Sequence, residues 1–389
     1  MSVETQTAYA KLARWCRERN YAGDDPFDGL NSRLFGATPL ARSRTARLAW
    51  TQLLKRSPIN FRRLAMVKVG RNPKGTALFA LAKLADLERT QSAEDADQAR
   101  ALLADLIGVQ LKGLSGAAWG YNFDWQGRAF FAKQGTPTIV PTAFAVRALL
   151  AAAECWREPP YLSTARSVCD FILTDLNRTI DTDDELCFSY SPADRTQVYN
   201  ASLLAGETLA AVSQVTGEAE LCEFAVRAAR YVVRQQKPDG SWAYGADDYQ
   251  GWADNFHTAF ILSSLSRIMK ACPQAAKEFA PALKRGYEFW RDSFFLSDGW
   301  PQYFPDRLYP VDAHSAGAAI ATFVERQDVD PAALDHAERI AHWAIRNLQS
   351  PRGYFYYQRH RFYTNRIPYM RWSQAWMAYA LALLAKSKQ

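Results

Sequence analysis

The sequence predicts an all-α protein and, within that class, an (α/α)6 toroid, which is a closed ring of six helix pairs. One unit of amphipathic stretch, turn, aromatic strip, loop and apolar stretch recurs along most of the 389 residues, at steps of 54 to 69 residues. The apolar stretches are rich in Ala, whereas the amphipathic stretches carry one charged face. Six such pairs can close on themselves, which removes the end faces that an open α-solenoid must cap. The open solenoid is the alternative, but its usual units are shorter.

The clearest unit lies in the middle of the chain. Its amphipathic stretch Leu221–Gln236 leads through a Pro-Asp-Gly turn into the aromatic strip 241–244, and the apolar run Phe256–Leu265 follows after a loop. The same order surrounds the other aromatic markers, which are Trp119, Phe188, Trp300 and Phe355. We expect these markers to separate an outer helix from an inner helix in each unit.

Inner and outer helices differ in composition. The Ala-rich stretches pack closely on most sides and are expected inside the ring: Ala143–Ala153, Ala201–Val212, Ala316–Val324 and Ala375–Ala385. Stretches with one charged face are expected outside: Leu162–Leu176 and Ala332–Leu348. The sixth pair is predicted between Ala41 and Leu87, with Pro58 ending one helix and Pro73 opening the next. The whole chain, 1–389, then forms one toroid domain, with 1–40 as an N-terminal helix and loop extension.

Composition places the chain among ordinary globular proteins, with 48% hydrophobic and 22% charged residues. The net charge of +7 comes from residues 1–75, which hold 15 Lys/Arg against 5 Asp/Glu. This basic segment suits an anionic glycan, a lipid-linked phosphate or weak contact with a membrane surface, and a solvated helix face is the plainer interpretation. Nucleic acid is not expected, because no nucleic-acid-binding module accompanies the charge.

No metal site or cofactor is predicted, since close His/Cys spacing and phosphate-binding Gly loops are absent from the sequence. The six scattered cysteines are interpreted as reduced, partly buried thiols: Cys16, Cys155, Cys169, Cys187, Cys222 and Cys272. A signal peptide and an apolar run of about 18 residues are not recognised, so a cytoplasmic location is expected.

Aromatic side chains are concentrated in the loops that lead to the inner helices. In a closed ring these loops meet at one end, the mouth, where flat rings suit the apolar faces of sugars. Half of these aromatics are expected to be core residues instead. The candidates for sugar binding are Trp119, Tyr121, Trp242, Tyr244, Trp300, Tyr303, Tyr356 and Trp372.

Polar clusters open four of the predicted inner helices. Asp254 precedes His257, and Asp312 precedes His314, so a carboxylate can stabilise charge on an imidazole in each pair. We take these four residues as the catalytic candidates, while noting that Asp is also a favoured helix N-cap. Asn200, Asn255, Arg371 and Trp372 in the same clusters are expected to bind substrate.

Two chemistries fit these residues. Glycoside cleavage needs a pair of carboxyl groups, and the loop candidates are Asp124, Asp194, Asp248, Asp254, Asp306 and Asp312. Epimerisation or elimination at a uronate needs a base, such as His257, His314 or a Tyr. For either reaction, Arg195, Arg366 and Arg371 suit the carboxylate of an acidic sugar.

The N-terminal stretch 21–31 is dense in turn formers and carboxylates. It either folds over the mouth of the ring or forms a solvated loop that its own Asp and Asn side chains cap.

Four segments carry a resemblance to known proteins: Gly23–Ser32, Arg56–Asn60, Asn255–His257 and Ile367–Met377. On these the chain resembles the VpsJ-like family encoded with bacterial exopolysaccharide and lipopolysaccharide genes. More distantly it is similar to six-hairpin glycosidases, unsaturated glucuronyl hydrolases, sugar 2-epimerases and the helical domain of glucuronyl C5-epimerases. The resemblance implies a carbohydrate-active enzyme of surface-polysaccharide metabolism that acts on an oligo- or polysaccharide.

We expect a hydrolase or transglycosylase acting on an acidic glycan first, and a uronyl C5-epimerase or lyase second. A non-catalytic glycan-binding subunit is the third possibility. The fourth is a terpene-cyclase-like enzyme, because Gln235–Trp242 resembles the QW repeat of that class and Asp181–Asp184 matches its acid motif in letters. In this chain the acid motif falls in a polar turn rather than at the start of an inner helix. This position favours a cluster of loop carboxylates over the acid motif of a cyclase.

Overall fold

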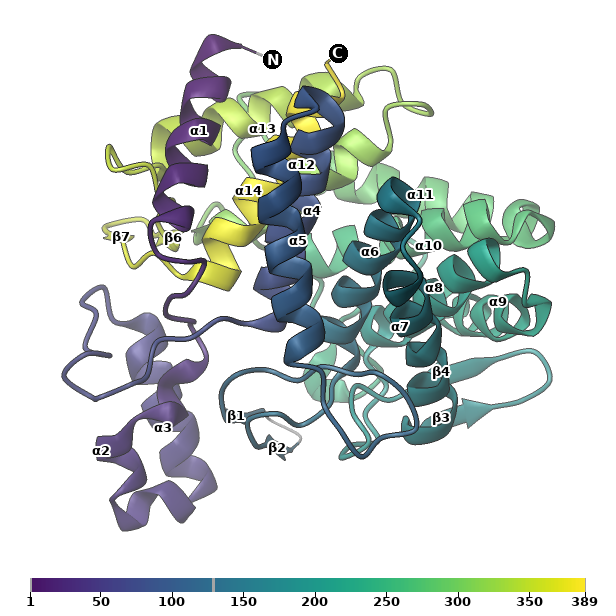
Figure 1. Cartoon of the computed structure of the whole chain (residues 1–389), viewed down its shortest axis with the longest axis horizontal. Helices are drawn as coiled ribbons and strands as arrows, with labels where there is room; N and C mark the ends of the chain where they lie inside the picture. The colour runs from purple at the N-terminus through teal and green to yellow at the C-terminus, as the bar shows by residue number, and fades with distance from the viewer. Residues whose placement is uncertain (1, 128–129, 389) are drawn as a thin grey trace.

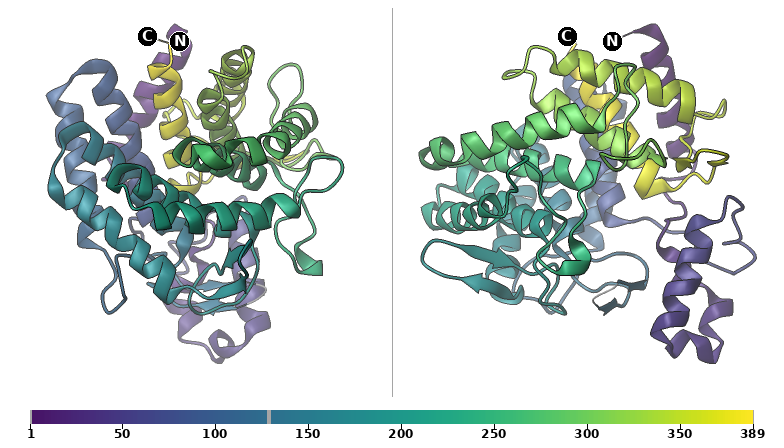
Figure 2. Two further views of the ribbon diagram at one scale, coloured as in Figure 1. Left: turned by 90° about the vertical axis from the view of Figure 1, so that its right-hand side faces the viewer. Right: turned by 180° about the vertical axis from the view of Figure 1, so that it is seen from behind.

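The protein is an (α/α)6 toroid in a computed structural model that describes residues 2–127 and 130–388. Six helices form the inner ring, each packed against the next, and the last packs against the first (Figures 1 and 2). They are α4 (Pro73–Thr90), α6 (Ile139–Trp156), α8 (Tyr199–Thr216), α10 (Asn255–Ala271), α12 (Ala313–Glu325) and α14 (Trp376–Lys386). The predicted closed ring is therefore confirmed.

Six outer helices cover this ring, and each packs on an inner partner. They are α1 (Val3–Arg17), α5 (Ala93–Gly108), α7 (Pro159–Asp170), α9 (Ala219–Arg234), α11 (Ala276–Phe294) and α13 (Ala333–Leu348). Each outer helix buries one apolar face, as α9 does with Leu221, Ala225 and Val232. Inner helices such as α12 are buried almost all round, because Ala and Gly side chains let neighbouring backbones approach closely.

The sixth pair differs from the prediction. Helix α1 is the outer partner of α14, so the two ends of the chain close the ring together. The predicted outer helix lies instead in α3 (Arg44–Arg56), which packs on neighbouring short segments outside the ring and buries only Thr51 and Leu54 of its own residues. Helix α3 has too narrow an apolar face for an outer position. That the chain forms one domain stays a prediction.

Residues 18–72 therefore form the connection from outer helix α1 to inner helix α4. This connection holds the short helices η1 (Asp28–Asn31), α2 (Arg33–Gly36) and η2 (Pro39–Arg42) in addition to α3. It projects from the ring at the lower left of Figure 1. We call residues 33–69 of this connection the lobe.

Short strands occupy the equivalent connections. Strands β1 (Trp125–Gln126) and β2 (Phe131–Ala132) form one antiparallel hairpin, and β3 (Arg178–Asp181) and β4 (Leu186–Phe188) form another. Strand β5 (Val311–Asp312) pairs with β6 (Gln358–Arg359), which pairs with β7 (Thr364–Asn365). The β6–β7 hairpin thereby lies beside the start of α12.

Two expectations about composition are corrected. Cys222 and Cys272 form a disulfide that joins α9 to the end of α10, whereas both were expected to be reduced; the other four cysteines are free thiols. Helix α6 is long and apolar enough to cross a membrane, with only Arg147 and Glu154 charged, although no such run was recognised. It is an inner helix of the ring, and 61% of its length is buried there.

Candidate functional site

A cavity of about 900 Å³ opens at the mouth, the end of the ring at which the inner helices begin. Its wall comes from the end of α3, the loop before α10, the loop between α11 and α12, and the β6–β7 hairpin. Among its lining residues are Lys55, Arg56, Trp252, Asp254, His257, Tyr303, Asp306, Tyr357, Gln358, His360 and Tyr363.

Asp254 and His257 form a dyad on the cavity wall. Asp254 is the N-cap of α10, and its Oδ1 accepts the backbone N–H of His257 at 3.0 Å. The Nδ1 atom of His257 lies 2.7 Å from Asp254 Oδ2. Since a carboxylate accepts hydrogen bonds, Nδ1–H is the donor, and in the neutral imidazole this leaves the lone pair on Nε2. The dyad is therefore arranged for proton transfer at Nε2.

Aromatic neighbours fix the orientation of this dyad. The Nε1–H group of Trp252 donates to Asp254 Oδ2 at 3.2 Å. Tyr244 stacks on Trp252 with ring centroids 4.8 Å apart and meets the His257 ring edge-on at 4.6 Å. Asp254 is 2% exposed, whereas the side chain of His257 keeps 22% of its surface exposed. The carboxylate is thus shielded from solvent while the imidazole reaches the cavity.

The second predicted pair, Asp312 and His314, is built differently. Asp312 caps α12 by accepting the backbone N–H of His314 at 2.7 Å. Its carboxylate also accepts Gln358 Nε2–H at 2.7 Å and Trp372 Nε1–H at 3.0 Å. Burial raises the pKa of Asp312 to about 6, although these hydrogen bonds and the positive charge of Lys55 act in the opposite direction.

His314 does not contact its own aspartate through the ring. It is 1% exposed, neither ring nitrogen has a hydrogen-bond partner, and it does not line the cavity. Its ring packs against Phe256 at 4.4 Å and Trp372 at 4.3 Å. Burial, followed by the charge of Lys74, lowers the pKa of His314 well below its usual value, so the imidazole is held neutral. Its expected catalytic role stays a prediction.

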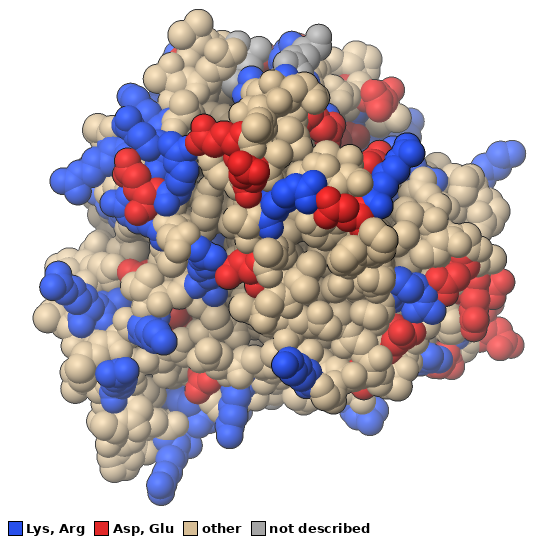
Figure 3. Space-filling view, viewed as in Figure 1, with Lys and Arg blue, Asp and Glu red and all other residues tan. Residues whose placement is uncertain are grey.

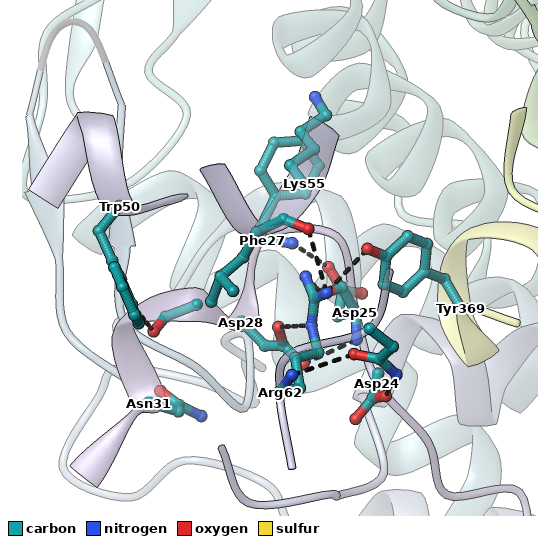
Figure 4. Close-up of polar contacts among 12 residues, drawn as sticks. Asp24, Asp25, Phe27, Asp28, Asn31, Trp50, Lys55, Arg62 and Tyr369 are labelled. Carbon is teal, nitrogen blue, oxygen red and sulfur yellow. Dashed lines mark hydrogen bonds and ion pairs between the residues drawn. The ribbon is translucent and has the colours of Figure 1, made fainter. Parts of the chain in front are cut away.

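Lys55 brings a positive charge to the cavity from outside the ring. It lies at the end of α3, with its Nζ 4.2 Å from the ring centroid of Phe27. Burial lowers the pKa of Lys55 to about 8, while the charge of Asp312 opposes this shift. In Figure 4 the Lys55 amine points away from the polar cluster around Arg62. Arg56 lines the same wall.

The stretch 21–31 folds onto the ring and does not form a solvated loop. Asp25 accepts two hydrogen bonds from the guanidinium of Arg371, at 2.6 and 2.8 Å. Phe27 packs against Trp372 with centroids 5.3 Å apart. These contacts hold the stretch against the start of α14.

Arg62, which is buried, links the lobe to Asp28 and to Tyr369, just before α14. Arg62 Nε donates to Asp28 at 2.6 Å, and its Nη1 donates to the hydroxyl of Tyr369 at 2.8 Å (Figure 4). Burial raises the pKa of Asp28 to about 7, and the nearby Arg62 opposes that shift. The lobe is thus joined to the stretch 21–31 by a buried ion pair and to the segment before α14 by the hydrogen bond to Tyr369.

This arrangement corrects the expectation for the arginines. Arg371 is 4% exposed and its guanidinium is occupied by Asp25, so it is not available to bind a uronate. Arg195 is exposed and lies away from the cavity wall, and Arg366 does not line the cavity but stacks over Tyr356 at 5.5 Å. The cations on the cavity wall are Lys55, Arg56 and Arg307.

Two predicted sugar-binding tryptophans are core residues. Trp119 and Trp242 are 0% and 1% exposed. Their indole N–H groups donate to the carbonyls of Leu106 and Val232, near the ends of the preceding outer helices. Both tryptophans therefore lie in the core, each bonded to the end of an outer helix, and their sugar-binding role stays a prediction. The QW-like segment that ends at Trp242 shows the same arrangement.

The remaining candidates are scattered around the mouth. Tyr303 lines the cavity and Tyr244 supports His257, whereas Trp300 and Tyr356 lie off the cavity wall. The other four candidates do not line the cavity. Tyr121 is hydrogen-bonded to the hydroxyl of Tyr190, and Trp372 packs on Phe27. Asn200 is buried with its Oδ1 unpaired, whereas Asn255 is hydrogen-bonded to Gln302 and Trp290. Asn255 is buried with both amide ends bonded inside the protein, and its substrate-binding role stays a prediction.

Sequence reasoning did not select Lys55, Gln358, His360 or Tyr363 as site residues. Lys55 was included only as part of the basic segment, and the hairpin residues follow an aromatic strip that was taken as the marker. Residues 358–365 do not alternate polar and apolar side chains, so the sequence carries no clear strand signal for this hairpin.

The acid motif that resembles that of terpene cyclases lies in the β3–β4 hairpin. Asp181 ends β3 and pairs with Arg178 and Arg227, and 182–184 form the exposed turn to β4. None of them lines the cavity.

Within the described residues 2–127 and 130–388, no group of three or more His, Cys, Asp or Glu side chains could hold a metal ion.

Comparisons with known proteins support the fold. No protein-family model matches the chain, and no curated protein matches it. Among solved structures, it is similar to cellobiose 2-epimerase from Bacillus thermoamylovorans, with a TM-score of 0.64, 13% identity, and 83% of this chain and 90% of that chain covered.

Two further structures have the same architecture. A GH76 α-mannanase from Bacteroides thetaiotaomicron has a TM-score of 0.63 at 12% identity, with 82% of this chain and 87% of that chain covered. An unsaturated glucuronyl hydrolase specific for heparin has a TM-score of 0.62 at 13% identity and covers 99% of this chain and 96% of its own. At such identities the likeness extends to the (α/α)6 toroid and no further.

Proposed function

We propose that the protein is a carbohydrate-active enzyme that moves a proton at a carbon atom of an acidic saccharide bound in the mouth cavity. The observation that carries this proposal is the 2.7 Å contact between His257 Nδ1 and Asp254 Oδ2, on the wall of a cavity that Lys55 and Arg56 also line. The reaction class is a uronyl epimerase or lyase, or an epimerase of a reducing sugar.

In this mechanism the lone pair of His257 Nε2 removes the proton from the carbon next to a carbonyl or carboxylate group. The electron pair of that C–H bond moves toward the adjacent oxygen. Asp254 stabilises the imidazolium through Nδ1–H and is not itself protonated. Delivery of a proton from water to the opposite face gives an epimer, and His257 then loses its proton to solvent. Loss of a β-substituent, which takes the proton from the imidazolium, gives an unsaturated sugar instead.

The cations on the wall supply the complementary charge. Lys55 lines the cavity with its ammonium group over the Phe27 ring, and the charge of Asp312 favours its protonated form. An enolate oxygen or a substrate carboxylate next to this group is stabilised more strongly than in water, because the surrounding wall is aromatic.

Glycoside hydrolysis or transglycosylation is the second candidate. Its supporting observation is Asp312, whose pKa is raised to about 6, closer to neutrality than that of a free aspartic acid, as a general acid requires. However, all of its contacts are with protein groups, and it does not line the cavity. Asp306 lines the cavity and is exposed, so it is the carboxylate that would act directly on substrate in this alternative.

The wider role stays a proposal. The resemblance in sequence supports a role in bacterial surface-polysaccharide metabolism. A non-catalytic glycan-binding subunit would keep the aromatic cavity without needing the Asp254–His257 contact. The terpene-cyclase alternative loses support, because its acid motif is on an exposed turn.

The test is incubation with uronate-containing and neutral oligosaccharides in heavy water, followed by mass spectrometry. We expect carbon-bound deuterium in chains of unchanged length, or unsaturated ends, and loss of both in His257→Gln. Shortened saturated chains without carbon-bound deuterium would instead establish a hydrolase. Binding of these saccharides with no chemical change would establish the binding subunit.

A further inference from the structure

Exposed hydrophobic side chains are concentrated in the lobe, residues 33–69. In the described part of the chain, 17 large hydrophobic side chains are exposed, and eight of them lie in this segment. They are Leu34, Leu40, Leu53, Ile59, Phe61, Leu64, Met66 and Val69, with exposures from 40% to 73%. Single exposed hydrophobic residues are common on proteins, but such a concentration on one projecting segment marks an interaction surface.

All the charged residues of the lobe are basic. It contains nine Lys and Arg residues and no Asp or Glu. Arg62 is buried against Asp28, whereas Arg33, Arg42, Arg63 and Lys68 are exposed. In Figure 3 the lower left of the molecule, where the lobe projects, carries blue side chains with few red ones among them. The surface thus combines positive charge with apolar side chains.

A second element extends this surface beside the cavity. The tip of the β6–β7 hairpin carries Arg361 and Phe362, the latter 87% exposed. The hairpin is joined to the lobe, because Asn365 Nδ2 donates to the carbonyl of Ser57 at 3.0 Å. Tyr363 at the same tip lines the cavity. The apolar and basic surface therefore reaches the rim of the mouth.

From this placement we propose that the lobe docks the protein on an anionic lipid bilayer, with the hairpin tip beside it. The exposed Leu, Ile and Phe side chains enter the headgroup region, and the exposed Arg and Lys side chains contact anionic headgroups. Docking does not depend on the function proposed above. If that function holds, Lys55 and Arg56 at the end of α3 place the cavity at the bilayer, within reach of saccharides carried by lipids.

Charge distinguishes a bilayer from a second copy of the chain. A symmetric contact between two lobes would bring two basic, acid-free surfaces together, which is unfavourable. A soluble anionic polymer would satisfy the arginines but would leave Ile59 and Leu64 in water. An anionic bilayer is the occupant that meets both the charge and the apolar side chains.

The experiment is co-sedimentation of the full-length protein with phosphatidylcholine vesicles, with and without phosphatidylglycerol. We expect binding only to the anionic vesicles, and a loss of about tenfold or more in both Ile59→Ser/Leu64→Ser and Arg42→Glu/Arg63→Glu. Two matched variants change equally exposed positions outside the lobe, Val215→Ser/Val329→Ser and Lys277→Glu/Arg352→Glu. Both are expected to bind as the wild type does.

Thermal unfolding of every variant checks that the ring remains folded, which is expected because all eight positions are exposed. Failure of the wild type to bind anionic vesicles would overturn the proposal. Equal losses in the lobe and control charge variants would also overturn it, because net charge alone would then explain binding. So would a dimer in solution that only Ile59→Ser/Leu64→Ser dissociates, since the lobe would then be a contact between copies.

Discussion

The starts of α10 and α12 carry the same two residue types and use them differently. At α10 the histidine is three residues after the capping aspartate, and its ring returns to that carboxylate at 2.7 Å. At α12 the histidine is two residues after the cap, and its ring is buried among Phe256 and Trp372 without a polar partner. One pair faces the cavity and the other faces the core.

Helix geometry explains the difference. Each residue advances about 100° around an α-helix. The side chain at the third helical position can therefore turn back to the N-cap residue, whereas the side chain at the second position is directed to another side of the helix. His257 occupies the third position and His314 the second. The spacing between an N-cap and a following side chain therefore decides whether the pair forms a dyad.

Replacement of His257 tests this comparison with the largest expected effect. His257→Gln removes the proposed base, and turnover is expected to fall about 10³-fold. The matched control is His360→Gln, because His360 lines the same cavity and stacks on Tyr363 without a carboxylate partner. The control is expected to stay within about threefold in kcat. Equal losses in the two variants would remove His257 from its assigned role.

The two caps can be compared directly with Asp254→Asn and Asp312→Asn. Asparagine also caps helices, so both variants are expected to fold. Loss of the carboxylate at His257 Nδ1 disturbs the tautomer, and kcat is expected to fall about 10²-fold or more. Asp312→Asn leaves the dyad intact and is expected to cost about tenfold at most. Steady-state kinetics on both variants would contradict the account if Asp312→Asn were the more damaging.

Lys55→Met is expected to act on binding more than on chemistry with acidic substrates. The ammonium group lines the cavity next to Phe27, and its loss leaves a substrate carboxylate without a counter-charge. KM for a uronate-containing saccharide is expected to rise about tenfold, with little change for a neutral saccharide. An equal rise in KM for both substrates would show that Lys55 shapes the cavity without recognising charge.

The pH profile follows from two shifted groups. As pH falls through about 6, Asp312 is protonated and Lys55 loses a compensating charge. As pH rises through about 8, Lys55 loses its proton and its attraction for an anionic substrate. Activity is expected to fall above about 8, and this alkaline limb is expected to move upward in Lys55→Arg. On the acid side the change that Asp312 causes is expected to be about tenfold at most, and it is expected to be absent in Asp312→Asn, which has no carboxylate to protonate. Rates measured across this range in both variants check the assignment.

His314→Phe carries the smallest expected effect. Both ring nitrogens are buried without partners, so an apolar ring of similar size removes unsatisfied polar atoms. The melting temperature is expected to stay unchanged or to rise by a few degrees. Turnover is expected to stay within about tenfold. A loss of turnover comparable to that of His257→Gln, in a folded protein, would restore a catalytic role for His314.

The architecture was predictable because most of the pairs repeat one order of outer helix, turn, aromatic marker and Ala-rich helix. The sixth pair escaped, since α1 and α14 lie at opposite ends of the chain and the long connection 18–72 hides the repeat. Sequence alone does not show which distant segments meet. The disulfide between Cys222 and Cys272 was missed for the same reason.

The site was predictable only where a local rule applied. Asp254 and His257 lie at the start of the same helix, so their spacing in the sequence is enough to predict that they are in contact. Lys55 and Gln358 reach the mouth from a lobe and a hairpin, and no local pattern brings them there. The core positions of Trp119 and Trp242 were not predicted, because a tryptophan that stacks on sugar and one that bonds the end of an outer helix can have the same residues around them in sequence.

The most direct test of the account is nitrogen NMR of the imidazole groups in protein labelled at histidine. The chain has only five histidines, so single substitutions assign every signal. The account predicts that neutral His257 is protonated at Nδ1, that this tautomer is lost in Asp254→Asn, and that His314 stays neutral at every pH at which the protein is folded. A neutral His257 protonated at Nε2, unchanged by Asp254→Asn, would contradict the proposed proton transfer.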